Sequence, residues 1–168
     1  MKTITQLFLL ATLLACQSKP SAQSDYPRMI GDIAFDKEQD DPDFKLCSGD
    51  KRAIQYYALP EKPYAEEKPA LKKHFLDQYD AEKTTRESGL IRIRFLVNCE
   101  GQAGRFRIMG MDWDYQEKTF DTSITDQLMS LTKSISKWKG FSSKSRGLDY
   151  YNYLIFKIEA GQLKEIMP

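Results

Sequence analysis

The sequence contains few of the residues on which enzymes and metal sites usually depend. It has one histidine and three cysteines in 168 residues, and it has no P-loop, no G-x-S-x-G motif and no His/Cys cluster with metal-ligand spacing. We therefore expect no catalytic residue, no metal and no cofactor. Asp112 and Asp114, on either side of Trp113, are the remaining acid–base candidates, and we interpret them as solvated loop residues.

The chain also has almost no net charge, and it lacks a hydrophobic run long enough to cross a membrane. It has 25 Lys and Arg against 24 Asp and Glu, so its composition gives no support for nucleic-acid binding. The apolar run that follows Lys2 is shorter than the roughly 20 residues that a spanning helix needs. Because this run begins after a charge and ends at small residues, residues 1–15 are predicted to be a cleaved signal peptide.

The end of this signal, Leu13-Leu14-Ala15-Cys16, resembles a bacterial lipobox. In such signals the peptide is cut before the cysteine, which then carries acyl chains such as palmitate. The resemblance implies a mature chain that begins at a lipidated Cys16 and is held at a membrane by those chains. An ordinary secreted protein is the alternative. Gln17, which no acidic run follows directly, favours the periplasmic face of the outer membrane.

Two cysteines remain for the exported part of the chain, Cys47 and Cys99. Exported proteins fold in compartments that permit disulfides, so one bridge between these cysteines is predicted. The bridge would close a loop of about 50 residues and contribute about 4 kcal/mol in the chain-entropy model. Two buried free thiols, or a cysteine nucleophile that works with His74, are the alternatives.

The chain after the signal is divided into a tether and one domain. Residues 16–44 are polar, contain prolines and include an acidic run at residues 36–43, so they are predicted to be a tether. Residues 45–168 are predicted to form the domain, with its core at about residues 68–160.

Hydrophobic periodicity predicts two helices and three strands in this domain. Helical spacing is found in residues 69–79 and in an apolar stripe from Ile124 to Trp138. Alternation of apolar and polar residues predicts three strands, at residues 91–99, 105–109 and 150–158. A helical crossover between the second and third strands predicts an α+β fold of the split βαβ type. Its three-stranded antiparallel or mixed sheet has the order 2-1-3, with the helices on one face.

The first two strands form a hairpin with a basic outer face. Its apolar faces coincide when Phe95 lies opposite Phe106 and Ile93 opposite Ile108, which also places Arg94 opposite Arg107. The outer face then carries four arginines: Arg92, Arg94, Arg105 and Arg107. Three interpretations of this basic face stay open: a solvated surface, a face covered by the acidic run 36–43, and a site for an acidic partner or a lipid headgroup.

The ordered set of hairpin, helix and strand resembles the TonB C-terminal domain family over about residues 68–160. The matching residues are Ser88–Asn98, Gly101 and Arg105–Met109, and then the helix that ends at Trp138 and the strand Tyr153–Ile158. Together with the lipobox, the chain is similar to small TonB-like lipoproteins of Bacteroidetes-type bacteria.

The resemblance implies a periplasmic protein-interaction module. In that family an edge strand of the domain pairs with a short peptide of an outer-membrane receptor. Carried over to this chain, the binding edge is the last strand, with Tyr151, Tyr153, Ile155 and Lys157. We therefore expect a lipid-anchored module associated with envelope receptor or transport proteins. The alternative is a structural lipoprotein that assembles with itself as a homodimer, because free strand edges also join sheets.

Overall fold

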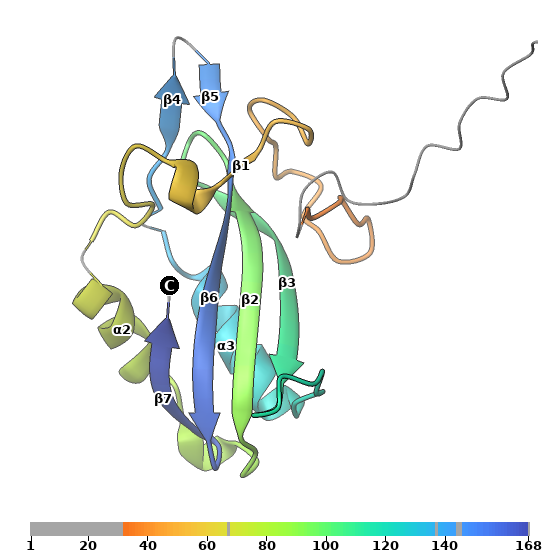
Figure 1. Ribbon diagram of the computed structural model, residues 1–168, viewed down its shortest axis with the longest axis vertical. Helices are drawn as coiled ribbons and strands as arrows, with labels where there is room; N and C mark the ends of the chain where they lie inside the picture. Colours follow the sequence, from red (N-terminus) through yellow and green to blue (C-terminus); the bar gives the residue numbers. More distant parts are fainter. Residues whose placement is uncertain (1–31, 67, 137, 144–145, 168) are drawn as a thin grey trace, which may run out of the picture. The chain divides into compact units, whose positions relative to one another are not determined.

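The computed structural model describes residues 32–66, 68–136, 138–143 and 146–167. In these residues a mostly antiparallel five-stranded sheet packs against two α-helices (Figure 1), so the predicted α+β class is confirmed. No helix in the described ranges is long and apolar enough to cross a membrane. Residues 1–31, which include Cys16, lie outside the described residues.

The three longest strands form the centre of the sheet. They are β2 (Gly89–Val97), β3 (Ala103–Met111) and β6 (Tyr150–Glu159), and β2 lies between the other two with antiparallel pairing on both sides. The predicted pairs of Ile93 with Ile108 and Arg94 with Arg107 are confirmed, whereas Phe95 and Phe106 are not register partners, because the register shifts between Arg94 and Leu96.

The sheet has two strands more than the sequence predicted. β1 (Ile54–Gln55) pairs in parallel with the start of β6, and β7 (Gln162–Met167) pairs antiparallel with its second half. The prediction missed β7, which is short and charged. Ala160 and Gly161 nevertheless have φ values of 50° and 79°, and two consecutive residues with positive φ are typical of the tight turns of hairpins.

A small separate hairpin precedes β6, in a segment for which no strand was predicted. Its strands are β4 (Phe141–Ser143) and β5 (Arg146–Leu148). Two short 3₁₀ turns complete the described chain, at Tyr56–Ala58 and Ala81–Lys83. They connect β1 to the first α-helix and that helix to β2.

Both α-helices are shorter than predicted. α2 spans Lys68–Leu76 and α3 spans Thr122–Lys133. The prediction of one apolar helical stripe as far as Trp138 is wrong at its end, because the chain leaves the helix after Ser134. Farther along, Trp138 forms a β-bridge with Tyr64, and the Lys139 N–H donates to the Pro63 carbonyl at 2.8 Å.

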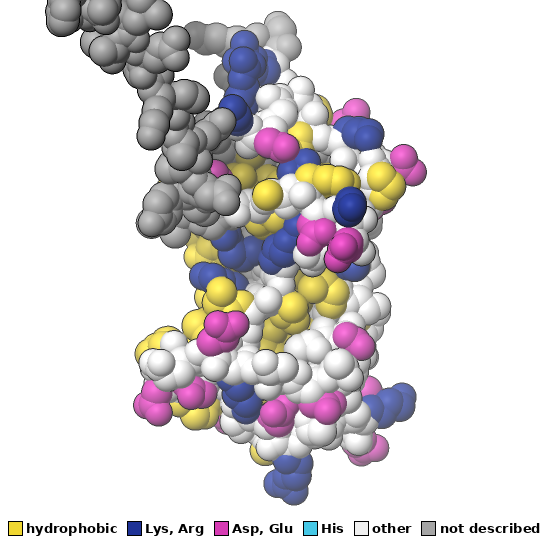
Figure 2. Space-filling view, turned by 90° about the vertical axis from the view of Figure 1, so that its right-hand side faces the viewer, with side chains coloured by type: hydrophobic (Ala, Val, Ile, Leu, Met, Phe, Trp, Pro, Cys, Tyr) yellow, Lys and Arg dark blue, Asp and Glu magenta, His cyan; other side chains and the backbone are white. Residues whose placement is uncertain are grey.

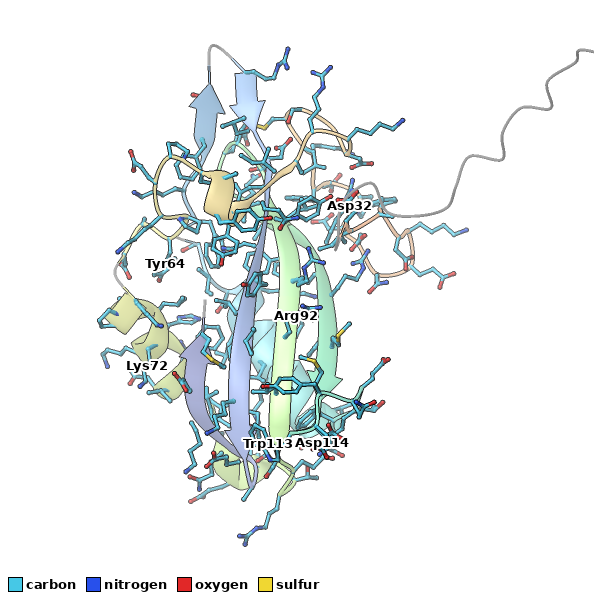
Figure 3. The ribbon with its side chains drawn as sticks, viewed as in Figure 1. Asp32, Tyr64, Lys72, Arg92, Trp113 and Asp114 are labelled. Atoms are coloured by element: carbon cyan, nitrogen blue, oxygen red, sulfur yellow. A yellow bond between two sulfur atoms is a disulfide. The ribbon has the colours of Figure 1, made fainter. Side chains whose placement is uncertain are left out.

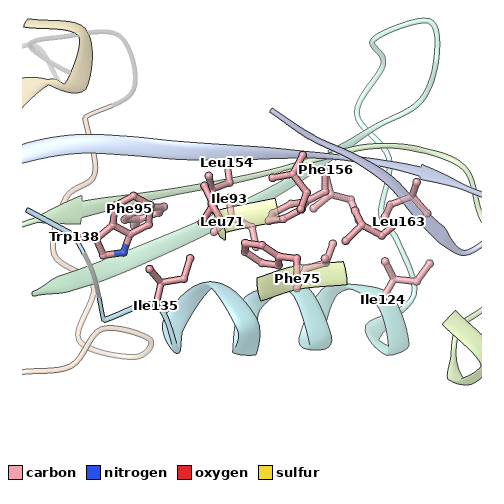
Figure 4. Close-up of a cluster of buried hydrophobic side chains, with 14 of the residues drawn as sticks. Leu71, Phe75, Ile93, Phe95, Ile124, Ile135, Trp138, Leu154, Phe156 and Leu163 are labelled. Carbon is pink, nitrogen blue, oxygen red and sulfur yellow. The ribbon is translucent and has the colours of Figure 1, made fainter. Parts of the chain in front are cut away.

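Both helices cover the same face of the sheet, and the main core lies between the helices and the sheet (Figure 4). Phe75 of α2 packs on Phe156 of β6 with ring centroids 4.9 Å apart. Trp138 packs on Phe95 of β2 at 5.0 Å, so it belongs to the core although it lies outside the helix. Each such side chain contributes about 1.5–3 kcal/mol by burial. The core therefore fixes the sheet firmly enough to hold side chains on its opposite face in place.

The described part of the predicted tether packs on that opposite face. We call residues 32–53 the cover segment, because Ile33, Phe44 and Ala53 are buried there against Leu96 and Tyr151. The predicted domain boundary at residue 44 is therefore wrong. The composition of the sequence did not indicate that the cover segment packs on the sheet, since the few apolar residues of this segment are separated by the acidic run.

Candidate functional site

Most of the predicted partner-binding edge of β6 is already paired. Ile155 and Lys157 lie opposite residues of β7, and Tyr151 lies beside β1. In the described chain only Tyr153, of the four predicted residues, has no strand partner on that side, and the Asn152 side chain accepts its backbone N–H at 2.9 Å. The prediction of a free edge at these residues is wrong, because the two strands that were missed occupy it.

Two of the four arginines are bound by carboxylates of the cover segment. Arg107 donates to both oxygens of Asp40, at 2.7 and 2.8 Å, and the Asp40 side chain is only 1% exposed. Arg105 donates to Asp50 Oδ1 at 2.6 Å. Intrachain cover by the acidic run is therefore the correct interpretation for Arg107. Asp50, which lies outside that run, does the same for Arg105.

A β-bulge explains why Arg105 is buried and not on a solvated surface. β3 has one extra residue between the partners of Arg94 and Leu96, and Arg105 there has a φ of 53°. The bulge turns its guanidinium beneath the ring of Phe35, 5.4 Å from the ring centre. This feature was not predicted, because an alternating pattern does not reveal an inserted residue.

The cover segment is also fixed at the bend of the hairpin. The predicted disulfide between Cys47 and Cys99 is confirmed, so neither cysteine is a free thiol or a nucleophile. Asp149, which is fully buried, accepts the backbone N–H groups of Cys47 and Ser48 at 2.9 and 2.7 Å. No pattern in the sequence indicated this role of Asp149, because its partners are about 100 residues away.

The other acid–base candidates have structural contacts. The His74 Nε2 lies 3.0 Å from the carbonyl oxygen of Leu131. Asp112 accepts the backbone N–H groups of Asp114 and Gln116, each at 2.9 Å, and thereby shapes the turn after β3. Within the described ranges, no group of three His, Cys, Asp or Glu side chains is placed to bind a metal ion.

The cover segment leaves part of its sheet face open. In Figure 3 Arg92 lies over the middle of β2, with Trp113 toward one end of the strand and Asp32 toward the other. We call this surface the open face. It consists of the residues that the register places on this side of the three central strands, together with the adjoining Trp113: Leu90, Arg92, Arg94, Met109, Met111, Trp113, Tyr153, Ile155 and Lys157. Met109 and Trp113 are 42% and 47% exposed, and the rest are half-buried.

Arg92 and Arg94 form no ion pair with a carboxylate in the described part of the chain. Arg92 Nη2 lies 3.7 Å from the Met109 sulfur, and its Nε is buried without a hydrogen-bond partner. Arg94 lies over the ring of Tyr151 at 5.8 Å. Burial, and then the charge of Arg92, lower the pKa of Arg94, while the charge of Asp32 opposes that change. Two like charges therefore lie close together on a partly desolvated surface.

The surface on the β3 side of the molecule differs from the open face in its distribution of charge. Figure 2 shows basic, acidic and hydrophobic side chains interspersed on that side. On such a surface, opposite charges can neutralise one another. On the open face Arg92 instead lies between Met109 and Ile155, and Arg94 lies between Arg107 and Tyr153.

An apolar cavity of about 250 Å³ lies near the unpaired part of β6. Its lining includes Tyr64, Leu71, Trp138 and Leu154, so it is on the helix side of the sheet. None of the four arginines lines it, and it is therefore separate from the open face.

Comparison of the chain with family models, with curated proteins and with solved structures gave no significant match.

Proposed function

We propose that this chain is a lipid-anchored protein of the cell envelope that binds another protein through the open face. The observation that carries the proposal is the half-covered sheet. The helices cover most of one face, whereas the cover segment leaves Met109, Trp113 and Ile155 partly exposed around two arginines. Arginine, methionine and aromatic residues are the types enriched at protein interfaces.

The proposed anchor is a lipidated Cys16, with the domain in the periplasm and the outer membrane as the favoured site. The disulfide between Cys47 and Cys99 supports export, because such bonds persist in oxidising compartments. The resemblance to TonB C-terminal domains supports an interaction role associated with envelope receptors or transport. The binding surface that we propose is the open face in place of the β6 edge.

Capture from solubilised envelopes tests the docking surface. The full-length protein would be compared with a double variant, Met109→Asn with Ile155→Thr, which makes the open face polar. Leu76→Asn on α2 is the matched control, since Leu76 is 44% exposed and Met109 is 42% exposed. We expect a defined partner with the wild type and the control and its loss with the double variant. Equal recovery by all three proteins would refute the open face as the docking surface.

The anchor is tested separately. Cells that express the wild type and Cys16→Ala would be labelled with radioactive palmitate. We expect label only in the wild type, and we expect the variant to leave the membrane fraction or to keep its signal peptide. Label in the variant would refute lipidation at Cys16.

Self-association is the second candidate function, and the observation that favours it is an edge at β3. In the described sheet β3 pairs only with β2. The bulge at Arg105 interrupts that edge, and the Lys118 N–H donates to the Gly110 carbonyl at 2.9 Å near its end. We favour a protein partner for this reason. Light scattering on the detergent-solubilised protein distinguishes the two, since a stable dimer would support self-association.

A further inference from the structure

We propose that the open face recognises a carboxylate of its protein partner, on an Asp or Glu flanked by apolar residues in an extended segment. Arg92 and Arg94 would bind this carboxylate together. The inference rests on the proposed function, because it names the chemical group that the same face binds.

The spacing of the two arginines fits one carboxylate. Arg92 and Arg94 are two residues apart on β2, so their side chains leave the same face of the strand about 6–7 Å apart. Two guanidinium groups at that separation can converge on one carboxylate, with one hydrogen-bond donor or more from each. Arginine is the residue best suited to such multiple bonding with carboxylates.

The covered half of the same face shows how this protein neutralises a half-buried arginine. There, the Asp40 carboxylate meets Arg107, which lies directly opposite Arg94 in the sheet. Arg92 has no such partner in the described chain, and its Nε is buried without a hydrogen bond. Because the Nε itself is buried, an incoming carboxylate would accept hydrogen bonds from the Nη groups of this half-buried guanidinium and would neutralise its charge.

The neighbours of Arg92 define what must flank the carboxylate. Met109 of β3 and Ile155 of β6 lie opposite Arg92 in the sheet, one on each side. Trp113 extends the apolar surface at one end and is 47% exposed. Apolar side chains on either side of the carboxylate would bury these groups and exclude water from the ion pairs.

Two other occupants fit less well. Membrane surfaces bind clusters of about 4–8 lysines and arginines that extend into solvent, whereas Arg92 and Arg94 are two residues and are half-buried. A second copy of the chain packed face to face would bring arginines against arginines, which is repulsive. Charge complementarity therefore favours a protein segment with a carboxylate.

The test measures binding of two synthetic peptides to the full-length protein in an uncharged detergent by isothermal titration calorimetry. One capped peptide contains Leu-Glu-Leu between Ser-Gly spacers, and the other has Gln in place of Glu. We expect the Glu peptide to bind about tenfold more tightly. Arg92→Gln should remove that preference without changing the affinity for the Gln peptide. Arg86→Gln, an exposed arginine outside the open face, is the matched control and should keep the preference.

Each outcome is informative about one of the two proposals. Equal binding of the two peptides, or the same effect of Arg92→Gln and Arg86→Gln, would overturn the inference. Tighter binding of the short-chain lipid dihexanoyl-phosphatidylglycerol than of the Glu peptide would also overturn it in favour of a lipid. If envelope capture depends on Met109 and Ile155 but not on Arg92, the proposed function stands and only the carboxylate inference fails.

Discussion

Replacement of Asp40 by Asn tests whether the cover segment is held by its ion pair with Arg107. Asp40 accepts two hydrogen bonds from Arg107, at 2.7 and 2.8 Å, and one from the Asp36 backbone N–H at 2.8 Å. Hydrogen bonds to charged groups contribute about 1.5–3 kcal/mol, and breaking a buried ion pair costs about 3–5 kcal/mol. Because Arg107 is 27% exposed and asparagine keeps one acceptor oxygen, we expect the lower value of about 2 kcal/mol.

The measurement is the free energy of unfolding from urea titrations at pH 7 and low salt. Asp41→Asn is the matched control, because Asp41 is the neighbouring carboxylate, is exposed and forms no ion pair among the described residues. We expect the control to change the free energy of unfolding by less than about 0.5 kcal/mol. If both variants were equally destabilised, net charge and not the ion pair would account for the loss.

The pH dependence of the free energy of unfolding provides a second test of the ion pair between Asp40 and Arg107. The hydrogen bond from Arg107 lowers the pKa of Asp40 below its usual value. A carboxyl with a lowered folded-state pKa stabilises the protein above its unfolded pKa of about 3.9, and this contribution is lost as the pH falls through the folded pKa. The wild type should therefore lose more stability than Asp40→Asn when the pH is lowered from about 6 to about 3. Equal losses would refute the pairing.

Two further predictions concern how the cover segment is attached. Replacement of Cys47 and Cys99 by Ser should lower the free energy of unfolding by about 4 kcal/mol, since the disulfide closes a loop with a separation of 52 residues. Urea titration of the oxidised wild type and of the variant measures this difference. Gly104→Ala should cost about 1–3 kcal/mol and increase hydrogen exchange in the cover segment, because a Cβ there would lie 2.4 Å from the Phe44 ring; unchanged exchange would contradict that close contact.

The central hairpin was predictable because a single physical pattern decides it. Ile91, Ile93 and Phe95 alternate with Arg92 and Arg94, and a shift of the strand by one residue would turn the whole apolar set to the other face of the sheet. The disulfide was predictable by elimination once Cys16 was assigned to the lipobox. In both cases the information lies in residues close in sequence or in a very small set of alternatives.

The rest of the site depends on contacts between distant residues, and for this reason the sequence did not reveal it. Asp40 appears in an acidic run that is typical of a solvated loop, and its burial depends on Arg107, 67 residues later. β7 pairs with β6 through the backbone, which leaves little trace in a short charged segment. The bulge at Arg105 changes the direction of a side chain without changing the alternation around it.

The open face exists because of where the carboxylates of the cover segment lie. Asp40 meets Arg107, and Ile33 and Phe44 fill the space over the neighbouring part of the sheet nearer the disulfide. Arg92 and its neighbours on the adjacent strands lie two residues farther along β2 than Arg94, which is opposite Arg107, and therefore about 6–7 Å away from it. The cover segment buries the part of the sheet beneath it with a carboxylate and apolar side chains together. A partner that supplied the same combination would complete the face with the same interactions, which is the physical reason for expecting a carboxylate between apolar residues.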